Sequence, residues 1–236
     1  NYLINMGIGT IDVFSYIWAM MEKDNRIVLT GGDAILMINS LAQFYPNKSI
    51  VSIQSHDYLN FPQKNWVKKL VQEGTGVNKN VVLSQAMAER PDYIVLDEFT
   101  KDMYSYKWYD INMTFVDFGL LPEYIDKVKS IGINAVVIYL DRQKINNIEQ
   151  MQISKIVEIN SGKMQKVVEF IKEDNAFRIN LLQSDIDIVG FYDRQKILRW
   201  IQDTDISDYL DFNNIINDYT TDKDRLFKKL AIEDSE

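Results

Sequence analysis

The fold is decided by residues 26–44, which read RIVLTGGDAILMINSLAQF. The run from Arg26 to Leu29 is short and apolar, as in a buried strand, and it ends in Thr30-Gly31-Gly32. A helical pattern then extends from Ala34 to Phe44 and stops at Tyr45-Pro46. A strand, a glycine turn and a helix in this order open a nucleotide-binding unit, so the sequence predicts an α/β fold of that kind.

Outside this stretch, apolar runs alternate with helical patterns over residues 1–150. The predicted strands are 49–53, 93–96, 113–116 and 135–139, and the predicted helices are 10–22, 83–89 and 122–130. Strands rich in Val, Ile and Leu that are separated by helices are typical of a mainly parallel sheet covered on both faces. Thr10 or Asp12 is expected to cap the first helix, and Trp18 is expected on the core side of that helix.

From Ser154 the pattern changes to a hairpin followed by a helical end. Residues 154–159 and 164–171 are predicted strands around a turn whose Gly162 suits a positive φ, 177–181 is a candidate third strand, and the chain is helical in pattern from Asp185. We expect one domain over residues 1–236, with an α/β core at 1–150 and a hairpin plus helical subregion at 151–236. The first residue is Asn1 rather than Met, which leaves open whether an upstream domain is missing from this chain.

The composition excludes several classes of function. The 236 residues include 26 Lys and Arg against 34 Asp and Glu, a net charge of −8, which argues against binding nucleic acid through its phosphates. The absence of cysteine excludes disulfides, thiolate metal ligands and a cysteine nucleophile, and the one histidine, His56, excludes a multi-histidine metal site. The sequence contains no run of 18 apolar residues, so it predicts no transmembrane segment. The chain is therefore expected in the cytoplasm, free or peripheral at a membrane.

The turn after the first predicted strand resembles a phosphate-binding loop in which the Lys and the Ser or Thr have been replaced. A working P-loop cradles phosphates with backbone N–H groups, places a Lys on the β- and γ-phosphates, and places a Ser or Thr on Mg²⁺. Gly31 and Gly32 are present, but Asp33, Ala34 and Ile35 follow them, and Asp33 would face phosphate with like charge. The glycine pair alone equally fits an ordinary turn.

Three spaced segments make a more specific pattern. They are IVSI at 50–53, LNFPQKNW at 59–66 and RPDYIVLDE at 90–98, and the helix end at 38–41 agrees with them. Together they resemble the nucleotide-binding core of the type II/IV secretion ATPases, the motors of type II secretion, type IV pili, conjugation-type secretion and the archaellum, and the archaeal members are the most similar. The resemblance implies a P-loop NTPase fold of the RecA-like kind. It also implies ATP and Mg²⁺ as the family's cofactors and a membrane platform protein as its partner.

The departures from this family share one direction. The family's acidic box resembles Ile-Glu-Asp-Thr-x-Glu-Leu, whereas residues 53–59 read IQSHDYL, so that all three carboxylates are replaced and Gln54 is a neutral isostere of the first. The family's later histidine box has no counterpart, since no His follows Glu98. Asp97 and Glu98 end a predicted strand, where α/β sites usually lie. They are either a residual contact for Mg²⁺ or nucleotide, or an inherited pair held by local hydrogen bonds.

Together, these losses lead us to expect a catalytically inactive homologue with a structural or regulatory role. Phosphoryl transfer depends on positioning and charge stabilisation, which the missing groups supply. We expect no cofactor and no metal, and a protein partner such as a true secretion or pilus motor or a membrane platform protein. The alternative is a divergent, weakly active ATPase that uses ATP and Mg²⁺. The aromatic segment 102–110 is either a partly buried loop or an interface, since Tyr and Trp dominate binding hot spots.

Overall fold

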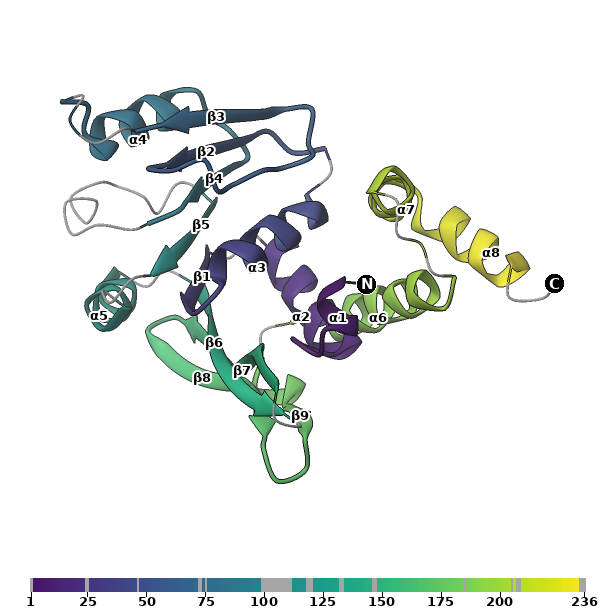
Figure 1. Ribbon diagram of the computed structural model, residues 1–236. Helices are drawn as coiled ribbons and strands as arrows, with labels where there is room; N and C mark the ends of the chain where they lie inside the picture. The colour runs from purple at the N-terminus through teal and green to yellow at the C-terminus, as the bar shows by residue number, and fades with distance from the viewer. Residues whose placement is uncertain are drawn as a thin grey trace.

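The computed structural model describes residues 2–23, 26–45, 47–71, 74, 76–98, 112–117, 121–131, 134–145, 148–184, 186–204, 206 and 209–233. Within those ranges the strands form a nine-stranded sheet in the order β3-β2-β4-β5-β1-β6-β7-β8-β9 (Figure 1). The strands are β1 (Arg26–Gly31), β2 (Ile50–Gln54), β3 (Trp66–Leu70), β4 (Tyr93–Leu96), β5 (Asn112–Asp117), β6 (Ala135–Ile145), β7 (Ile148–Asn160), β8 (Lys163–Ile171) and β9 (Ala176–Ile179). The helices are α1 (Tyr2–Asn5), α2 (Ile11–Glu22), α3 (Ala34–Leu41), α4 (Lys79–Ala88), α5 (Leu121–Ile131), α6 (Ile188–Asp203), α7 (Tyr209–Thr221) and α8 (Lys223–Glu233), with short 3₁₀ helices η1 (Ala42–Phe44) and η4 (Leu181–Gln183).

The sheet has a parallel part and an antiparallel part, as the sequence predicts. Strands β3, β2, β4, β5, β1 and β6 pair in parallel, and β6 to β9 form an antiparallel meander. Helices α6 to α8 then close the chain. The predicted class is confirmed: a mainly parallel α/β sheet, then a hairpin and a helical end. The division expected at residue 150 falls inside β7, which continues its pairing with β6 on both sides of that residue.

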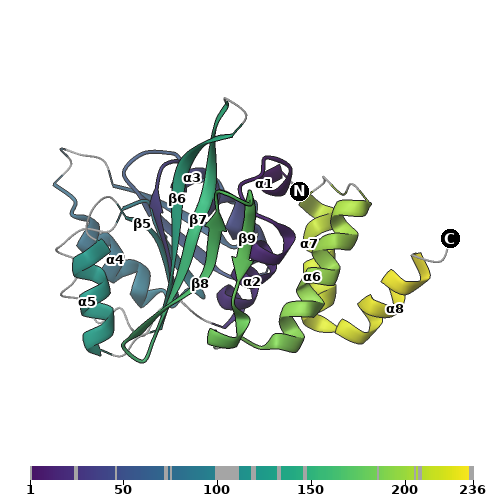
Figure 2. The same ribbon diagram turned by 90° about the horizontal axis from the view of Figure 1, so that it is seen from below.

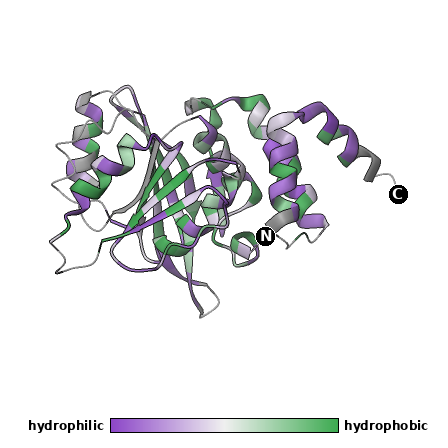
Figure 3. Cartoon of the chain, turned by 90° about the horizontal axis from the view of Figure 1, so that it is seen from above, coloured by the Kyte–Doolittle hydropathy of each residue, from purple (hydrophilic) through white to green (hydrophobic). Residues whose placement is uncertain are grey.

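Helices cover both faces of the sheet, because alternate side chains of each strand point to opposite faces. Ile27 and Leu29 of β1 belong to a core shared with α2, α3, α6, α7 and α8. Val28 lies between them and belongs to a second core with α4 and α5. Figures 1 and 2 show α4 and α5 on one side of the sheet and α2, α3 and α6 on the other. In Figure 3 the hydrophobic residues concentrate in the sheet and on the helix surfaces that face it, whereas α8 is mostly hydrophilic.

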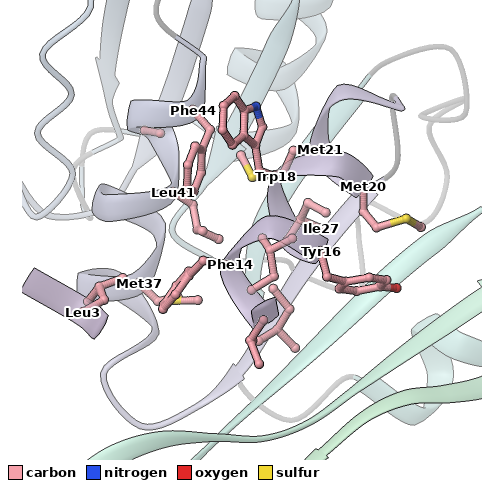
Figure 4. Packing of buried hydrophobic residues seen from close by; sticks show 14 of the residues in the cluster. Leu3, Phe14, Tyr16, Trp18, Met20, Met21, Ile27, Met37, Leu41 and Phe44 are labelled. Carbon is pink, nitrogen blue, oxygen red and sulfur yellow. The ribbon is translucent and has the colours of Figure 1, made fainter. Parts of the chain in front are cut away.

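Trp18 is the centre of the larger core, which confirms its predicted place on the inner side of α2. Its side chain is 0% exposed, and its ring stacks on Phe44 with centroids 5.3 Å apart (Figure 4). Tyr219 of α7 meets the same ring edge-on at 5.4 Å. Of the two predicted caps for α2, Thr10 takes the position, and its hydroxyl accepts from Val13 N at 3.4 Å. Helix α2 therefore packs against both the sheet and the C-terminal helix α7.

Several boundaries differ from the sequence prediction. Strand β3 was not predicted; Trp66 begins it and donates its indole N–H to Ser52 Oγ at 2.8 Å. Helix α4 begins earlier than predicted, because Asn78 accepts from Asn80 N at 2.8 Å and caps it. The aromatic segment 102–110 lies outside the described residues. None of the helices in the described ranges is both long and apolar enough to cross a membrane.

Candidate functional site

The predicted site residues lie at the carboxyl ends of three parallel strands. Gly31 ends β1, Gln54 ends β2, and Asp97 follows β4. Strand β5 lies between β1 and β4, so the glycine turn is separated from Asp97 by one strand. Gln54 and Asp97 are neighbours, since Ser55 N donates to Asp97 Oδ2 at 2.5 Å. The edge at which ligands bind in open α/β sheets is thus the edge where these residues gather.

The glycine turn is packed against strand β6. Gly31 has φ 109°, and a Cβ at this position would lie 1.8 Å from the carbonyl oxygen of Leu140, so no other residue fits. Asp33 is in the left-handed region at φ 58° and begins α3 without a side-chain cap. Its Oδ1 accepts instead from Arg142 Nη2 at 3.5 Å, and Arg142 Nε is the atom nearest to a Cβ built on Gly32, at 3.5 Å. An exposed ion pair therefore lies over the turn.

The two residues after Asp33 supply no polar group to the turn. Ala34 is buried in the larger core, and Ile35 packs against it. In a working P-loop, helix-initial positions carry the Lys and the hydroxyl that hold phosphate and Mg²⁺. Here these positions contribute to packing.

Gln54 stabilises the turn that follows β2. Its side chain is 0% exposed, and its Oε1 accepts from the backbone N–H groups of Tyr58 and Leu59 at 3.1 and 2.8 Å. A glutamate here would also accept these bonds, so the isosteric amide keeps the turn without the charge. His56 stacks on Tyr58 with ring centroids 5.2 Å apart and lies on the exposed side of the turn. Gln54 itself carries no carboxylate, and Asp57 in its turn pairs with Lys68, whose Nζ lies 2.7 Å from Asp57 Oδ1.

A lysine that sequence reasoning missed neutralises the strand-end carboxylates. Lys79, the first residue of α4, places Nζ 2.8 Å from Asp97 Oδ1 and 3.3 Å from Glu98 Oε2. The side chains of Lys79 and Asp97 are only 11% and 8% exposed, so this pair is shielded from water, whereas Glu98 is 45% exposed. A cation at a helix N-terminus opposes the helix dipole, so the position needs the acidic partners that it has.

These contacts decide what the site can do chemically. Both oxygens of Asp97 are engaged, one by Lys79 and one by Ser55 N. The turn at Gly31 has a carboxylate, Asp33, where phosphate charge would have to lie. Among the described residues no group of three Asp, Glu or His side chains could hold a metal. Asp97 and Glu98 therefore form an ion-paired, hydrogen-bonded strand end.

The predicted residues thus fall into two groups. Gln54, Asp97 and Glu98 come together around Ser55 and Lys79, whereas Gly31 to Ile35 lie apart, beside β6. Lys79 and Arg142 were not predicted, because each is brought to the edge by a distant segment. The signal that could have identified Lys79 is a basic residue directly after the capping Asn78, at the end of the helix that favours acidic side chains.

Comparison with known proteins supports the fold. No protein-family model and no curated protein sequence matches the chain. Among solved structures, it is similar to the VirB11 ATPase from the Brucella suis type IV secretion system, which was solved in complex with sulphate. The identity is 15%, the TM-score is 0.51, and the match covers 61% of this chain and 51% of that chain. At this identity the likeness shows a shared fold, the mainly parallel α/β fold of a secretion ATPase.

Two further solved structures are similar over a larger part of the chain. The pilus retraction motor PilT with bound ADP has 12% identity and a TM-score of 0.45, covering 79% of this chain and 56% of that chain. The Legionella pneumophila ATPase DotB has 11% identity and a TM-score of 0.37, covering 77% and 54%. The chain spans about half the length of each of the three solved structures.

Proposed function

We propose that this chain is a catalytically inactive homologue of the type II/IV secretion ATPases, nearest to their archaeal members, with a structural or regulatory role. The α/β fold and the segments at 50–53, 59–66 and 90–98 support the relationship. The observation that carries the proposal is the pairing of Lys79 with both strand-end carboxylates, a shielded pair with Asp97 at 2.8 Å and a more exposed pair with Glu98 at 3.3 Å.

The energetics of phosphoryl transfer support an inactive role. Its rate enhancement comes from placing cations and donors around the transferred phosphoryl group. Removal of one such group typically lowers the rate by a factor of about 10² to 10³. This chain lacks the P-loop Lys, the Mg²⁺-binding hydroxyl and the acidic-box carboxylates, and it places Asp33 at the turn. Several simultaneous losses of this size leave no useful catalysis.

The proposed partner is a protein of a secretion, pilus or archaellum machinery. A true motor ATPase or a membrane platform protein would be met in the cytoplasm, at the membrane periphery. The fold supports this, since the similar solved structures include a type IV secretion ATPase. A pull-down with the full chain should recover a motor or platform protein.

A titration with Mg·ATP tests the proposal. A ligand with a Kd of about 1 mM would stabilise the folded chain by about 1.4 kcal/mol at about 10 mM. In a chain of this size that raises the melting temperature by roughly 3 to 5 °C. We expect no shift, no heat of binding in calorimetry and no phosphate release.

The matched control is Gly32→Asp. Gly32 has an open Cβ position, 3.5 Å from the nearest side chain, so the substitution adds a carboxylate to the turn without a clash. If the natural chain gains stability with Mg·ATP and this variant does not, nucleotide binds at the turn and the inactive-homologue proposal fails. Phosphate release that the variant abolishes would establish the weakly active ATPase instead.

A further inference from the structure

A cavity of about 430 Å³ lies on the α2 and α6 side of the antiparallel part of the sheet. Its walls come from the segment between α1 and α2, from β7, from the hairpin of β8 and β9, and from the C-terminal half of α6. Figure 2 shows α1, α2, β9 and α6 gathered on this side of the molecule. The volume lies within the range of sites that bind small molecules or peptide segments. The cavity shares no residue with the turn at Gly31.

Primary amides dominate the polar lining of the cavity. They belong to Gln150, Gln152, Asn175 and Gln202. Gln152 is the most informative, because it is only 3% exposed and its buried Oε1 has no hydrogen-bond partner among the residues that the structure describes. Its Nε2 donates to the carbonyl oxygen of Gly7 at 3.4 Å, which fixes the side chain. A buried acceptor without a donor is unfavourable, so a ligand N–H is the group that this position lacks.

The charges of the cavity balance. Asp12 and Arg199 stand at its mouth with side chains 43% and 59% exposed, and Arg199 Nη2 is 3.8 Å from Asp12 Oδ1. Gln195 also donates to Asp12 Oδ1. No other charged residue lines the described cavity. The surroundings therefore suit an uncharged ligand better than a phosphate or a carboxylate.

The apolar wall has an angled shape. Phe170 and Phe177 face each other across β8 and β9, with centroids 5.2 Å apart and ring planes tilted by 57°. Two tilted rings do not form parallel surfaces that could enclose a planar base, but they contact an aliphatic side chain well. Gly7 and Gly9 also line the cavity.

We propose that this cavity binds a short, uncharged peptide segment of a partner protein. A primary amide carries both a donor and an acceptor, so it can pair with the N–H and the C=O of a peptide group. Gln150, Gln152 and Gln202 bind the backbone of the segment, and the Gln152 Oε1 accepts one of its N–H groups. One aliphatic side chain of the segment packs on Phe170 and Phe177. The site stands independently of whether the chain binds Mg·ATP.

The probe is N-acetyl-Ala-Leu-Ala-amide, which has no charge at either end. Titrated into the ¹⁵N-labelled full chain, it should shift the side-chain amide resonances of Gln152 and Gln202 saturably. Replacing Leu by Ser in the probe should weaken binding roughly tenfold, since the aliphatic contact is lost. Gln152→Met and Gln202→Ala should each weaken it roughly five- to tenfold, the effect of one hydrogen bond. Gln85→Ala, on the exposed face of α4, is the matched control and should change nothing.

Three outcomes would overturn the proposal. The first is the absence of any saturable shift at the highest soluble concentration of the probe. The second is equal binding by the Leu and Ser probes, or by the natural chain and Gln202→Ala. The third is a shift of the same resonances by adenosine but not by either tripeptide, which would assign the cavity to a nucleoside. Because Gln202 lies at the surface of α6, its variant decides the test even if Gln152→Met does not fold.

Discussion

Replacing Lys79 by Met is expected to destabilise the fold by about 3 kcal/mol. The ammonium lies 2.8 Å from Asp97 Oδ1, and both side chains are about nine-tenths buried, at 11% and 8% exposed. At an effective dielectric constant of about 20 the gross attraction at this distance is about 6 kcal/mol. Desolvation of the two ions offsets much of it, but removal of one partner leaves a buried charge and typically costs about 3–5 kcal/mol. Relief of the unfavourable helix dipole reduces this slightly.

A double-mutant cycle measures the pairing itself. Lys79→Met, Asp97→Asn and the double variant are unfolded in urea, and we expect a coupling free energy of at least about 1.5 kcal/mol. The double variant should recover much of the loss, since no unpaired charge remains. Lys69→Met with Glu89→Gln is the matched control, because that pair is as short, 2.6 Å, but partly exposed at 21% and 46%. Its coupling should stay below about 1 kcal/mol.

The refuting result is specific. If Lys79→Met costs less than about 0.5 kcal/mol, or if its coupling to Asp97 equals that of the exposed control pair, Lys79 does not neutralise Asp97 in solution. Asp97 would then have an oxygen free for a metal, and the main support for an inactive site would be lost.

Three further predictions follow from other contacts. Gly31→Ala should lower the free energy of unfolding by at least about 3 kcal/mol, because its Cβ would lie 1.8 Å from the carbonyl oxygen of Leu140. Gly32→Ala should lower it by less than about 1 kcal/mol, and unfolding both variants in urea measures the difference. Tyr16→Phe removes a 2.6 Å hydrogen bond to the buried Glu158 and should lower the free energy of unfolding by about 1–3 kcal/mol. Burial first, and then the charge of Glu158, raises the pKa of Tyr16. The stability that this phenol contributes is therefore present below about pH 10 and is lost as the pH rises further, a decline that the variant should lack. Burial is the largest single effect on the pKa of Asp92 and raises it, but the hydrogen bonds from Ser49 and the charge of Lys48 together outweigh burial, so this pKa is lowered. The resulting stability is present above about pH 4 and is lost on acidification. Asp92→Asn should flatten that acid dependence, by a fraction of about 1 kcal/mol because the carboxylate is 43% exposed.

Strands in the interior of the sheet are predictable from the sequence, because burial on both faces requires consecutive apolar residues. The strands β1, β2 and β4 each contain three Ile, Val or Leu residues, all of them buried, and the glycine turn follows from Gly31 and Gly32 alone. Strand β3 has no such apolar run, since it lies at the sheet edge and carries Lys68 and Lys69. Charged edge strands protect a sheet against unwanted pairing, and the same charges hide them from a pattern search.

The site was predictable by its position but not by its contacts. Strand ends placed Gln54, Asp97 and Glu98 at one edge, which the structure brings together around Ser55. The cations that pair with the acidic groups come from elsewhere: Lys79 precedes Asp97 by 18 positions, and Arg142 follows Asp33 by 109. No local pattern relates residues at such separations, because only the folded sheet brings them into contact.

The difference between a lysine and a metal ion bears on regulation as well as catalysis. A metal binds and leaves with nucleotide, so its carboxylates can report which ligand is present, and a ligand shifts a conformational equilibrium only by binding two states unequally. Lys79 is tethered to α4, whose Val82, Leu83 and Ala86 are fixed in the second core. Its ammonium therefore faces Asp97 at a high effective concentration, and a free cation at millimolar concentration would have to displace it. If the proposed function is right, we expect the domain to keep one state as the nucleotide concentration changes, and we expect any regulation to act through contacts with a partner protein.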